Sequence, residues 1–239
     1  MGTVVTVDLF GVDGRADELL HDATQSLHRA DEMFSLWKPE SPFARLRRGE
    51  LALTDAPDEV VGVLNECYPL VAASDGWFDP WSLPGGVDVT GYVKGWAAER
   101  AADILAAGDF AGVIVNAAGD IATRGRDLDG QLFRVGLVSP TAPQTLAATV
   151  TLDGALATSG SYERGTHLYN PKARHFGTRA RTASVTGPHL GIADALATAV
   201  VCGGVDALKA VRRLPDYDAM VTRYDGEVVA TEGFPFVRD

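Results

Sequence analysis

The sequence predicts an α+β fold: a mixed, largely antiparallel sheet with helices packed against it. Apolar residues recur at helical spacing in several long segments, such as Ala16 to Phe34. Short β-rich runs lie between them, and Asp-Gly dipeptides at 129–130, 153–154 and 225–226 separate such runs in the manner of hairpin turns. Helices and strands interleave without a regular βαβ repeat, which favours α+β over α/β.

The first half of the chain supplies one strand and two helices. Thr3 to Phe10 alternates β-branched residues with others and predicts a strand. Helical periodicity predicts helices over Ala16 to Phe34 and Glu59 to Val71. The segment Ser35 to Pro42 lies between them and carries Trp37 and two prolines, which is typical of loops that hold ligands on a rigid scaffold.

The second half adds helices and most of the strands. A helix is predicted from Lys94 to Ala106, after glycine-rich loops that permit close backbone approach. Gly112 to Ala117 predicts a buried strand that leads into Ala118-Gly119-Asp120. Two further helices are predicted, over Gly191–Cys202 and Val205–Arg213.

Composition indicates a folded domain of 239 residues, with 46% hydrophobic and 22% charged residues. We expect one compact domain over residues 1–239, since no internal repeat or low-complexity linker is visible. The net charge of −11 disfavours a nucleic-acid or anionic-membrane surface. The two cysteines, Cys67 and Cys202, lie in apolar helical patterns and are expected to be buried thiols.

The N-terminal segment shows no export signal, because no basic stretch leads into an apolar region. No apolar run reaches the roughly 18 residues that a membrane span needs. The sequence therefore predicts a cytoplasmic protein without a membrane span, unless a leader preceded Met1 in the natural chain.

Asp194 and Thr198 are the most informative pair, since they lie one helical turn apart in the small apolar run Ile192 to Ala199. A carboxylate and a hydroxyl on one helix face are ligands that magnesium prefers. The same residues also fit a structural role. Asp194 could cap the start of a helix, and Thr198 could bond to the preceding turn.

Eight short motifs follow one another along the chain. They are Met1-Gly-Thr, Ser35-x-Trp-x-Pro-x-Ser, Gly76-x-Phe-Asp-Pro, Asp88-x-x-Gly-x-x-Lys-Gly, Ala118-Gly-Asp-Ile, Ala157-Thr-Ser-Gly-Ser-Tyr-Glu-Arg, His167-x-x-Asn-Pro and Ala193-Asp-Ala-Leu-Ala-Thr-Ala. In this order they resemble the FAD:protein FMN transferase family, the ApbE-like flavin transferases, from Met1 to about Gly204.

The resemblance implies a magnesium-dependent enzyme that binds FAD. Such an enzyme transfers FMN to a threonine of an acceptor protein through a phosphodiester bond and releases AMP. Asp194 and Thr198 match the side-chain magnesium ligands of the family, and Gly91 falls where the family supplies a backbone carbonyl. His167 matches a family histidine and is assigned as the general base that takes the proton of the threonine hydroxyl.

The resemblance also implies a set of FAD contacts along the cleft. Lys94 is a point charge suited to phosphate, and Asp88 is an acceptor for adenosine or ribose groups. Trp37 offers a stacking surface where the family usually has a tyrosine. The remaining residues at such positions are Met1, Trp77, Phe78, Asp79 and Tyr169.

Several departures from the family pattern affect loops around this cleft, among them Lys172-Ala173-Arg174 where a glycine is expected. Ala118 replaces a glycine, Asn170 replaces an aspartate, and Arg47 stands where an asparagine would help shape the FAD pocket. They keep three other functions open. These are an FAD pyrophosphatase that gives FMN and AMP, a non-catalytic flavin-binding module, and an α+β domain in which Asp194 and Thr198 only cap a helix.

Overall fold

A seven-stranded sheet forms the centre of the computed structural model, which describes residues 3–142, 144–160 and 168–237. The strand order is β1-β2-β3-β6-β9-β10-β11, and every pairing among the described residues is antiparallel. The strands are β1 (Val5–Phe10), β2 (Gly112–Ala117), β3 (Asp120–Gly125), β6 (Ala155–Gly160), β9 (Thr182–Gly187), β10 (Asp218–Thr222) and β11 (Val228–Ala230).

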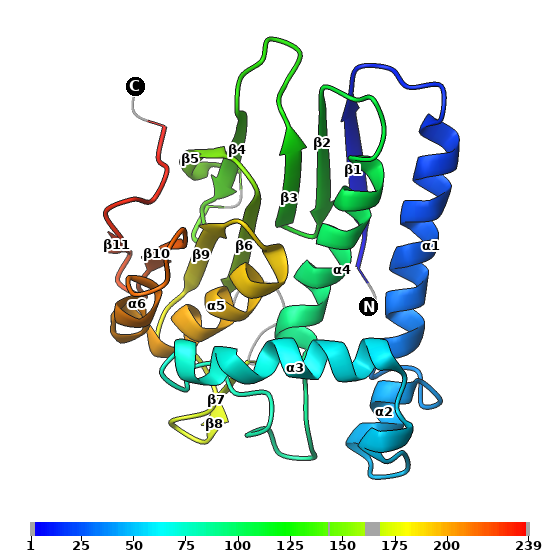
Figure 1. Ribbon diagram of the computed structural model, residues 1–239. Coiled ribbons are helices and arrows are strands. Elements are labelled where there is room, and N and C mark those ends of the chain that lie inside the picture. Colours follow the sequence, from blue (N-terminus) through cyan, green and yellow to red (C-terminus); the bar gives the residue numbers. More distant parts are fainter. Residues whose placement is uncertain (1–2, 143, 161–167, 238–239) are drawn as a thin grey trace.

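Two small sheets accompany the large one. β4 (Phe133–Val138) pairs with β5 (Leu146–Leu152), and β7 (Tyr169–Asn170) pairs with β8 (His175–Phe176). The helices are α1 (Ala16–Phe34), α2 (Pro42–Arg47), α3 (Asp58–Ala73), α4 (Thr90–Leu105), α5 (Leu190–Gly203) and α6 (Val205–Val211), with a short 3₁₀ turn at Leu53–Asp55. Figure 1 shows α4 and α5 against one face of the sheet, with α3 running across their ends.

The two faces of the sheet carry different cores because side chains alternate along each strand. Ala157, Val185 and Val221 belong to the large core that packs against the helices. Leu156 and Met220 belong to a smaller core on the opposite face, together with Leu137, Val150 and Phe234 from β4, β5 and the C-terminal segment. The sheet therefore separates a helix side from a hairpin side.

Most predicted elements are confirmed, but two of the three Asp-Gly hairpins are wrong. Asp225-Gly226 joins the antiparallel pair β10 and β11, as predicted. Asp129-Gly130 and Asp153-Gly154 instead connect strands of different sheets. Gly130 and Gly154 do adopt positive φ, so the local turn chemistry holds while the chain leaves one sheet for the other. An Asp-Gly turn therefore does not by itself determine which strands pair.

A tight hairpin turn lies instead at Ala118-Gly119, between β2 and β3. Both residues have positive φ, 50° and 93°, as the common two-residue hairpin turns require. Helix α4 begins at Thr90, before the predicted start, so Gly91 lies in its first turn and not in the preceding loop. Both cysteines are free and buried, as predicted.

The segment after the predicted loop forms a short helix, α2, that the sequence prediction missed. Ser41 precedes it, and its hydroxyl accepts a hydrogen bond from the backbone N–H of Ala44. Pro42 occupies the first helical position, where its missing N–H costs nothing. The Ser-Pro pair was the available signal. Among the described residues, no helix is long and apolar enough to cross a membrane.

Candidate functional site

Close contact between α4 and α5 builds the site. A Cβ on Gly95 would lie 2.4 Å from the carbonyl oxygen of Leu190 and 3.0 Å from Cβ of Asp194. A Cβ on Gly91, one turn earlier, would lie 3.0 Å from Thr198 Oγ1. The helices run antiparallel, since 91 meets 198 while 95 meets 194. Because Gly91 and Gly95 have no side chains, Asp194 and Thr198 can pack directly against the backbone of α4.

Asp194 is buried, with 3% of its surface exposed, and contacts α4 rather than its own helix. Its Oδ2 accepts a hydrogen bond of 3.1 Å from the Gly95 N–H and lies 3.7 Å from Lys94 Nζ. Burial raises the pKa of Asp194, while Lys94 and the Gly95 N–H act in the opposite direction. α5 begins four residues earlier, at Leu190, so Asp194 is not the helix cap.

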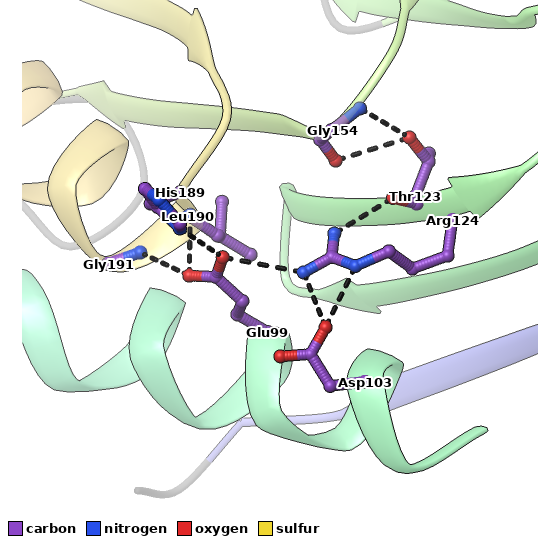
Figure 2. A network of polar contacts seen from close by, with 8 residues as sticks. All are labelled: Glu99, Asp103, Thr123, Arg124, Gly154, His189, Leu190 and Gly191. Atoms are coloured by element: carbon purple, nitrogen blue, oxygen red, sulfur yellow. Dashed lines mark hydrogen bonds and ion pairs between the residues drawn. The ribbon is translucent and has the colours of Figure 1, made fainter. Parts of the chain in front are cut away.

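Glu99 supplies the acceptor at the start of α5. Its Oε2 accepts the Leu190 N–H at 2.8 Å and the Gly191 N–H at 3.4 Å. Its Oε1 lies 3.0 Å from His189 Nδ1 and 3.4 Å from Arg124 Nη2. Figure 2 shows this network between α4, α5 and β3. Glu99 continues the Gly91–Gly95 face of α4, so that one face fixes α5 at three successive turns.

Lys94 bridges two buried carboxylates. Its ammonium forms an ion pair with Asp120, which follows the Ala118-Gly119 turn and is fully buried. The other oxygen of Asp120 accepts a hydrogen bond of 3.1 Å from the Thr158 N–H on β6. Two carboxylates near each other would repel if both were charged, and the ammonium between Asp120 and Asp194 offsets this repulsion.

A cavity of about 330 Å³ opens above this cluster. Thr198 lies in it, with its hydroxyl 3.3 Å from Ser159 Oγ of β6. Trp37 lies among the lining residues with 89% of its surface exposed. The lining is Phe34, Ser35, Leu36, Trp37, Asp88, Thr90, Gly91, Val93, Lys94, Ala118, Thr158, Ser159, Gly160, Leu168, Asp194 and Thr198.

Six predicted site residues come together in this cavity: Trp37, Asp88, Gly91, Lys94, Asp194 and Thr198. Met1 and His167, two further predictions, lie outside the described residues. The structure adds four polar groups that the prediction did not assign: Asp120, Thr158, Ser159 and Glu99. Asp120 stands in the Ala-Gly-Asp motif, and Thr158 and Ser159 stand in the Ala-Thr-Ser-Gly motif, so membership of these motifs was the usable signal.

Four other predicted residues are not part of the cavity lining. Trp77 is buried, packs against Gly203, and carries Lys172 Nζ 4.2 Å above its ring. Phe78 is buried beside Gly91, with its ring 3.5 Å from where a Cβ on that glycine would lie.

Asp79 and Tyr169 also make contacts away from the cavity. Asp79 accepts the Trp81 N–H at 3.0 Å within a turn. Tyr169 packs edge-on against Phe176, with 5.3 Å between the ring centroids. Trp77, Phe78, Asp79 and Tyr169 therefore do not line the cavity in this structure.

Arg47 on α2 pairs with Asp88 near the cavity. Its Nη1 lies 2.7 Å from Asp88 Oδ2, and its Nε donates to the Gly85 carbonyl at 3.2 Å. Asp88 Oδ1 accepts the backbone N–H and the hydroxyl of Thr90 at 2.9 and 2.6 Å. Both oxygens of Asp88 thus have partners within the protein, and Arg47 fixes the loop that leads into α4.

The oxygen atoms of Asp194, Thr198 and Gly91 suit a hard cation whose remaining coordination positions are filled by a bound molecule. The described residues contain no group of three His, Cys, Asp or Glu side chains that could hold a metal. They do offer the buried Asp194 carboxylate, the Thr198 hydroxyl and the adjacent Gly91 backbone. Within the described part of the chain, both contacts of the Asp194 carboxylate fall on Oδ2. Oδ1 is therefore the oxygen suited to coordination, and magnesium takes its remaining ligands from phosphate and water.

Known proteins resemble this chain both in sequence and in fold. The family model described as the ApbE family matches residues 1–84 and 81–221. A curated FAD:protein FMN transferase of Vibrio cholerae serotype O1 is 28% identical over 136 residues. That alignment covers 52% of this chain and 41% of the relative, so it spans less than half of the relative's length.

Solved structures share the fold over nearly the whole chain. The flavin transferase ApbE from Vibrio cholerae superposes with a TM-score of 0.84 at 18% identity, covering 99% of this chain and 96% of that one. The ApbE protein of Thermotoga maritima gives a TM-score of 0.84 at 19% identity, covering 97% and 94%. These likenesses confirm the predicted helix and antiparallel-sheet architecture.

Proposed function

Because the chain belongs to the ApbE family, we propose that it is a FAD:protein FMN transferase. In this proposal it moves FMN from FAD to a threonine hydroxyl of an acceptor protein and releases AMP. One observation carries it: the cavity places a lysine ammonium, a buried carboxylate and a hydroxyl side by side. That grouping suits a pyrophosphate, and the curated Vibrio relative bears the name of this activity.

Asp194, Thr198 and the Gly91 carbonyl are the proposed holders of Mg²⁺. When bound, the cation would neutralise charge on pyrophosphate oxygens as a Lewis acid. Lys94 adds a positive charge that Asp120 holds in place, and this charge faces the same oxygens. Burial of Asp194 raises the pKa of its carboxyl, whereas the nearby Lys94 ammonium lowers it. The positive charge of Lys94 therefore favours the ionised form of Asp194, which coordination requires.

The chemical step is a displacement at phosphorus. The acceptor Oγ forms a bond to the FMN phosphorus while the bond to the bridging oxygen breaks, and that oxygen leaves with AMP. The proton on the acceptor Oγ passes to a base, for which we propose His167. Lys94 stabilises the negative charge that builds on the leaving phosphate.

FAD contacts complete the proposal. Trp37 offers an exposed ring that can cover an aromatic face of the nucleotide. Asp88, which pairs with Arg47 and lines the cavity, is the proposed acceptor for adenosine or ribose groups. Met1, Trp77, Phe78, Asp79 and Tyr169 remain proposed contacts from the family resemblance alone.

The proposal is tested by incubating the protein with FAD, Mg²⁺ and an acceptor protein that carries an exposed Asp-Gly-x-Thr-Gly segment. Flavin fluorescence on the acceptor band of a denaturing gel, with AMP released in equal amount, is the expected result. A matched reaction with excess chelator should give neither product. Free FMN and AMP without a labelled acceptor would instead select an FAD pyrophosphatase. FAD binding that gives no product and ignores chelator would select a flavin-binding module.

A further inference from the structure

A second cavity lies on the hairpin side of the sheet. It has a volume of about 240 Å³ and is formed between the large sheet and the β4–β5 pair. Its walls include Ile121, Leu137 and Met220 from the smaller core. The Ala118-Gly119 turn contributes to its rim, where the space beside Gly119 is open. The proposed FAD and metal roles leave this cavity without an occupant.

The floor of this cavity is a patch of hydroxyl groups on three neighbouring strands. Thr158 of β6 pairs in register with Ser184 of β9, and their hydroxyls lie 2.9 Å apart. Thr182 lies two residues before Ser184 on β9, on the same face, and pairs with Thr222 of β10. Four hydroxyl side chains therefore share one face, which is unusual beside an apolar core.

Thr222 adds a second observation at the wall of this cavity. Only 5% of its surface is exposed, and its hydroxyl has no hydrogen-bond partner among the described residues. A buried polar group without a partner costs about 1–3 kcal/mol. Such a group in a cavity lining is explained when a ligand supplies the partner.

The cavity adjoins the proposed transfer site. Ala118 and Thr158 line both cavities. The N–H of Thr158 bonds to Asp120, which is the ion-pair partner of Lys94. A molecule in the second cavity would therefore lie next to the groups that face the pyrophosphate.

Charge and size restrict the occupant. Among the described residues that line the cavity, none has a charged side chain. An unpaired charge or a phosphate would lose its hydration there without compensation. The volume is below the roughly 300–1,000 Å³ of typical small-molecule sites. It suits one or two neutral side chains with both apolar and hydrogen-bonding parts.

We propose that this cavity binds neutral side chains of the acceptor protein, beside the threonine that receives FMN. The inference rests on the proposed function, since only a transferase needs a protein as second substrate. It assigns acceptor recognition to β6, β9 and β10 on the hairpin side, while FAD is held on the helix side. The hydroxyl of Thr222 would donate to or accept from the bound side chain.

Two substitutions of Thr222 test the proposal. Thr222→Val removes the hydroxyl without changing the shape, and Thr222→Met fills part of the cavity. Thr186→Val is the matched control, because Thr186 is buried on the same face of β9 but does not line the cavity. The probe is a fluorescein-labelled peptide that contains Asp-Gly-Ala-Thr-Gly, and its binding is followed by anisotropy. FAD binding is titrated separately by flavin fluorescence.

We expect the peptide Kd to rise about tenfold or more for Thr222→Val and further for Thr222→Met, as loss of a buried hydrogen bond predicts. The FAD Kd should stay within about twofold, and Thr186→Val should match the wild type in both. An unchanged peptide Kd in both Thr222 variants, or no peptide binding to the wild type, would overturn the inference. So would a parallel loss of FAD affinity, which would place the flavin in this cavity.

These readouts separate the two proposals. Peptide binding that weakens at Thr222 supports the second cavity whether or not flavin is transferred. Flavin transfer in the wild type with unaltered peptide binding in both Thr222 variants keeps the proposed function and rejects the acceptor site.

Discussion

The two cavities lie on opposite faces of one sheet and differ in how they handle charge. The helix-side cavity holds Lys94 between two buried carboxylates, at a place where glycines bring α4 and α5 into contact. The hairpin-side cavity is lined by hydroxyl, amide and apolar groups. Buried charges need fixed partners, and on the helix side α4, α5 and the start of β3 supply them. In the proposed function the transfer chemistry is confined to the helix side, and the hairpin side is left for recognition of neutral groups.

A single sheet separates the two cavities, because successive side chains along a strand point to opposite faces. On β6, Ser159 faces Thr198 and α5, while its neighbour Thr158 faces Ser184 on the hairpin side. The Thr158 backbone N–H still reaches Asp120. Adjacent residues of one strand therefore contribute to both cavities.

The largest expected effect is on the helix side, from Asp194→Ala. Loss of the proposed metal ligand should lower the rate of acceptor labelling more than about 100-fold, beyond the 10–100-fold typical of changes to groups that only orient ligands. The circular dichroism spectrum should be unchanged, since burial opposes the charge on this carboxyl in any case. A labelling rate within about tenfold of the wild type would contradict the assignment.

Lys94→Met tests whether the Lys94–Asp120 ion pair contributes to stability. It leaves Asp120 buried without its ion-pair partner, which should cost about 3 kcal/mol of unfolding free energy in urea titrations. The double variant Lys94→Met with Asp120→Asn removes both charges and should recover most of that loss. If the double variant were as unstable as the single one, the ion pair would not be the cause.

Gly91→Ala tests the close contact of α4 and α5. The new Cβ would lie 3.0 Å from Thr198 Oγ1, so the hydroxyl must move by a few tenths of an ångström. We expect the Mg²⁺ concentration for half-maximal activity to rise about tenfold or less, with a smaller change in kcat. Gly62→Ala is the control: it lies inside α3 with open space around a Cβ and should stabilise the protein by about 0.5–1 kcal/mol. An equal metal requirement in both variants would count against the contact.

The smallest effect is expected from Glu99→Gln at the far end of the same helix contact. The amide oxygen can still accept an N–H at the start of α5, but the charge interactions with Arg124 and His189 are lost. Unfolding free energy should fall by about 1 kcal/mol or less. Glu99→Ala, which also removes the acceptor, should cost more. Equal stabilities of the two variants would show that the N–H bonds contribute nothing.

The sequence predicted most of the helices and the shared helix face of Asp194 and Thr198, because both depend on short-range spacing. α1 was predicted to its exact ends by apolar periodicity, and Asp194 and Thr198 were predicted to share a helix face. Whether Asp194 capped its own helix could not be decided locally. The answer came from Glu99, which is distant in sequence and takes the capping position.

Long-range pairing was beyond the sequence. The wrong hairpins at Asp129-Gly130 and Asp153-Gly154 were correct turns whose strands pair elsewhere. Arg47 stood out as a departure from the family pattern, yet its partner Asp88 is visible only in three dimensions. The hydroxyl patch of the second cavity joins three strands, and no single segment reveals it.

We propose that Asp194 and Thr198 hold the cation on which flavin transfer depends. Electron paramagnetic resonance of Mn²⁺, titrated into the protein with FAD present, tests it without relying on turnover. The wild type should bind one Mn²⁺ per chain, and Asp194→Ala should bind it at least about 100-fold more weakly. Equal Mn²⁺ affinity in the two proteins would show that Asp194 is not a metal ligand and that the metal binds elsewhere.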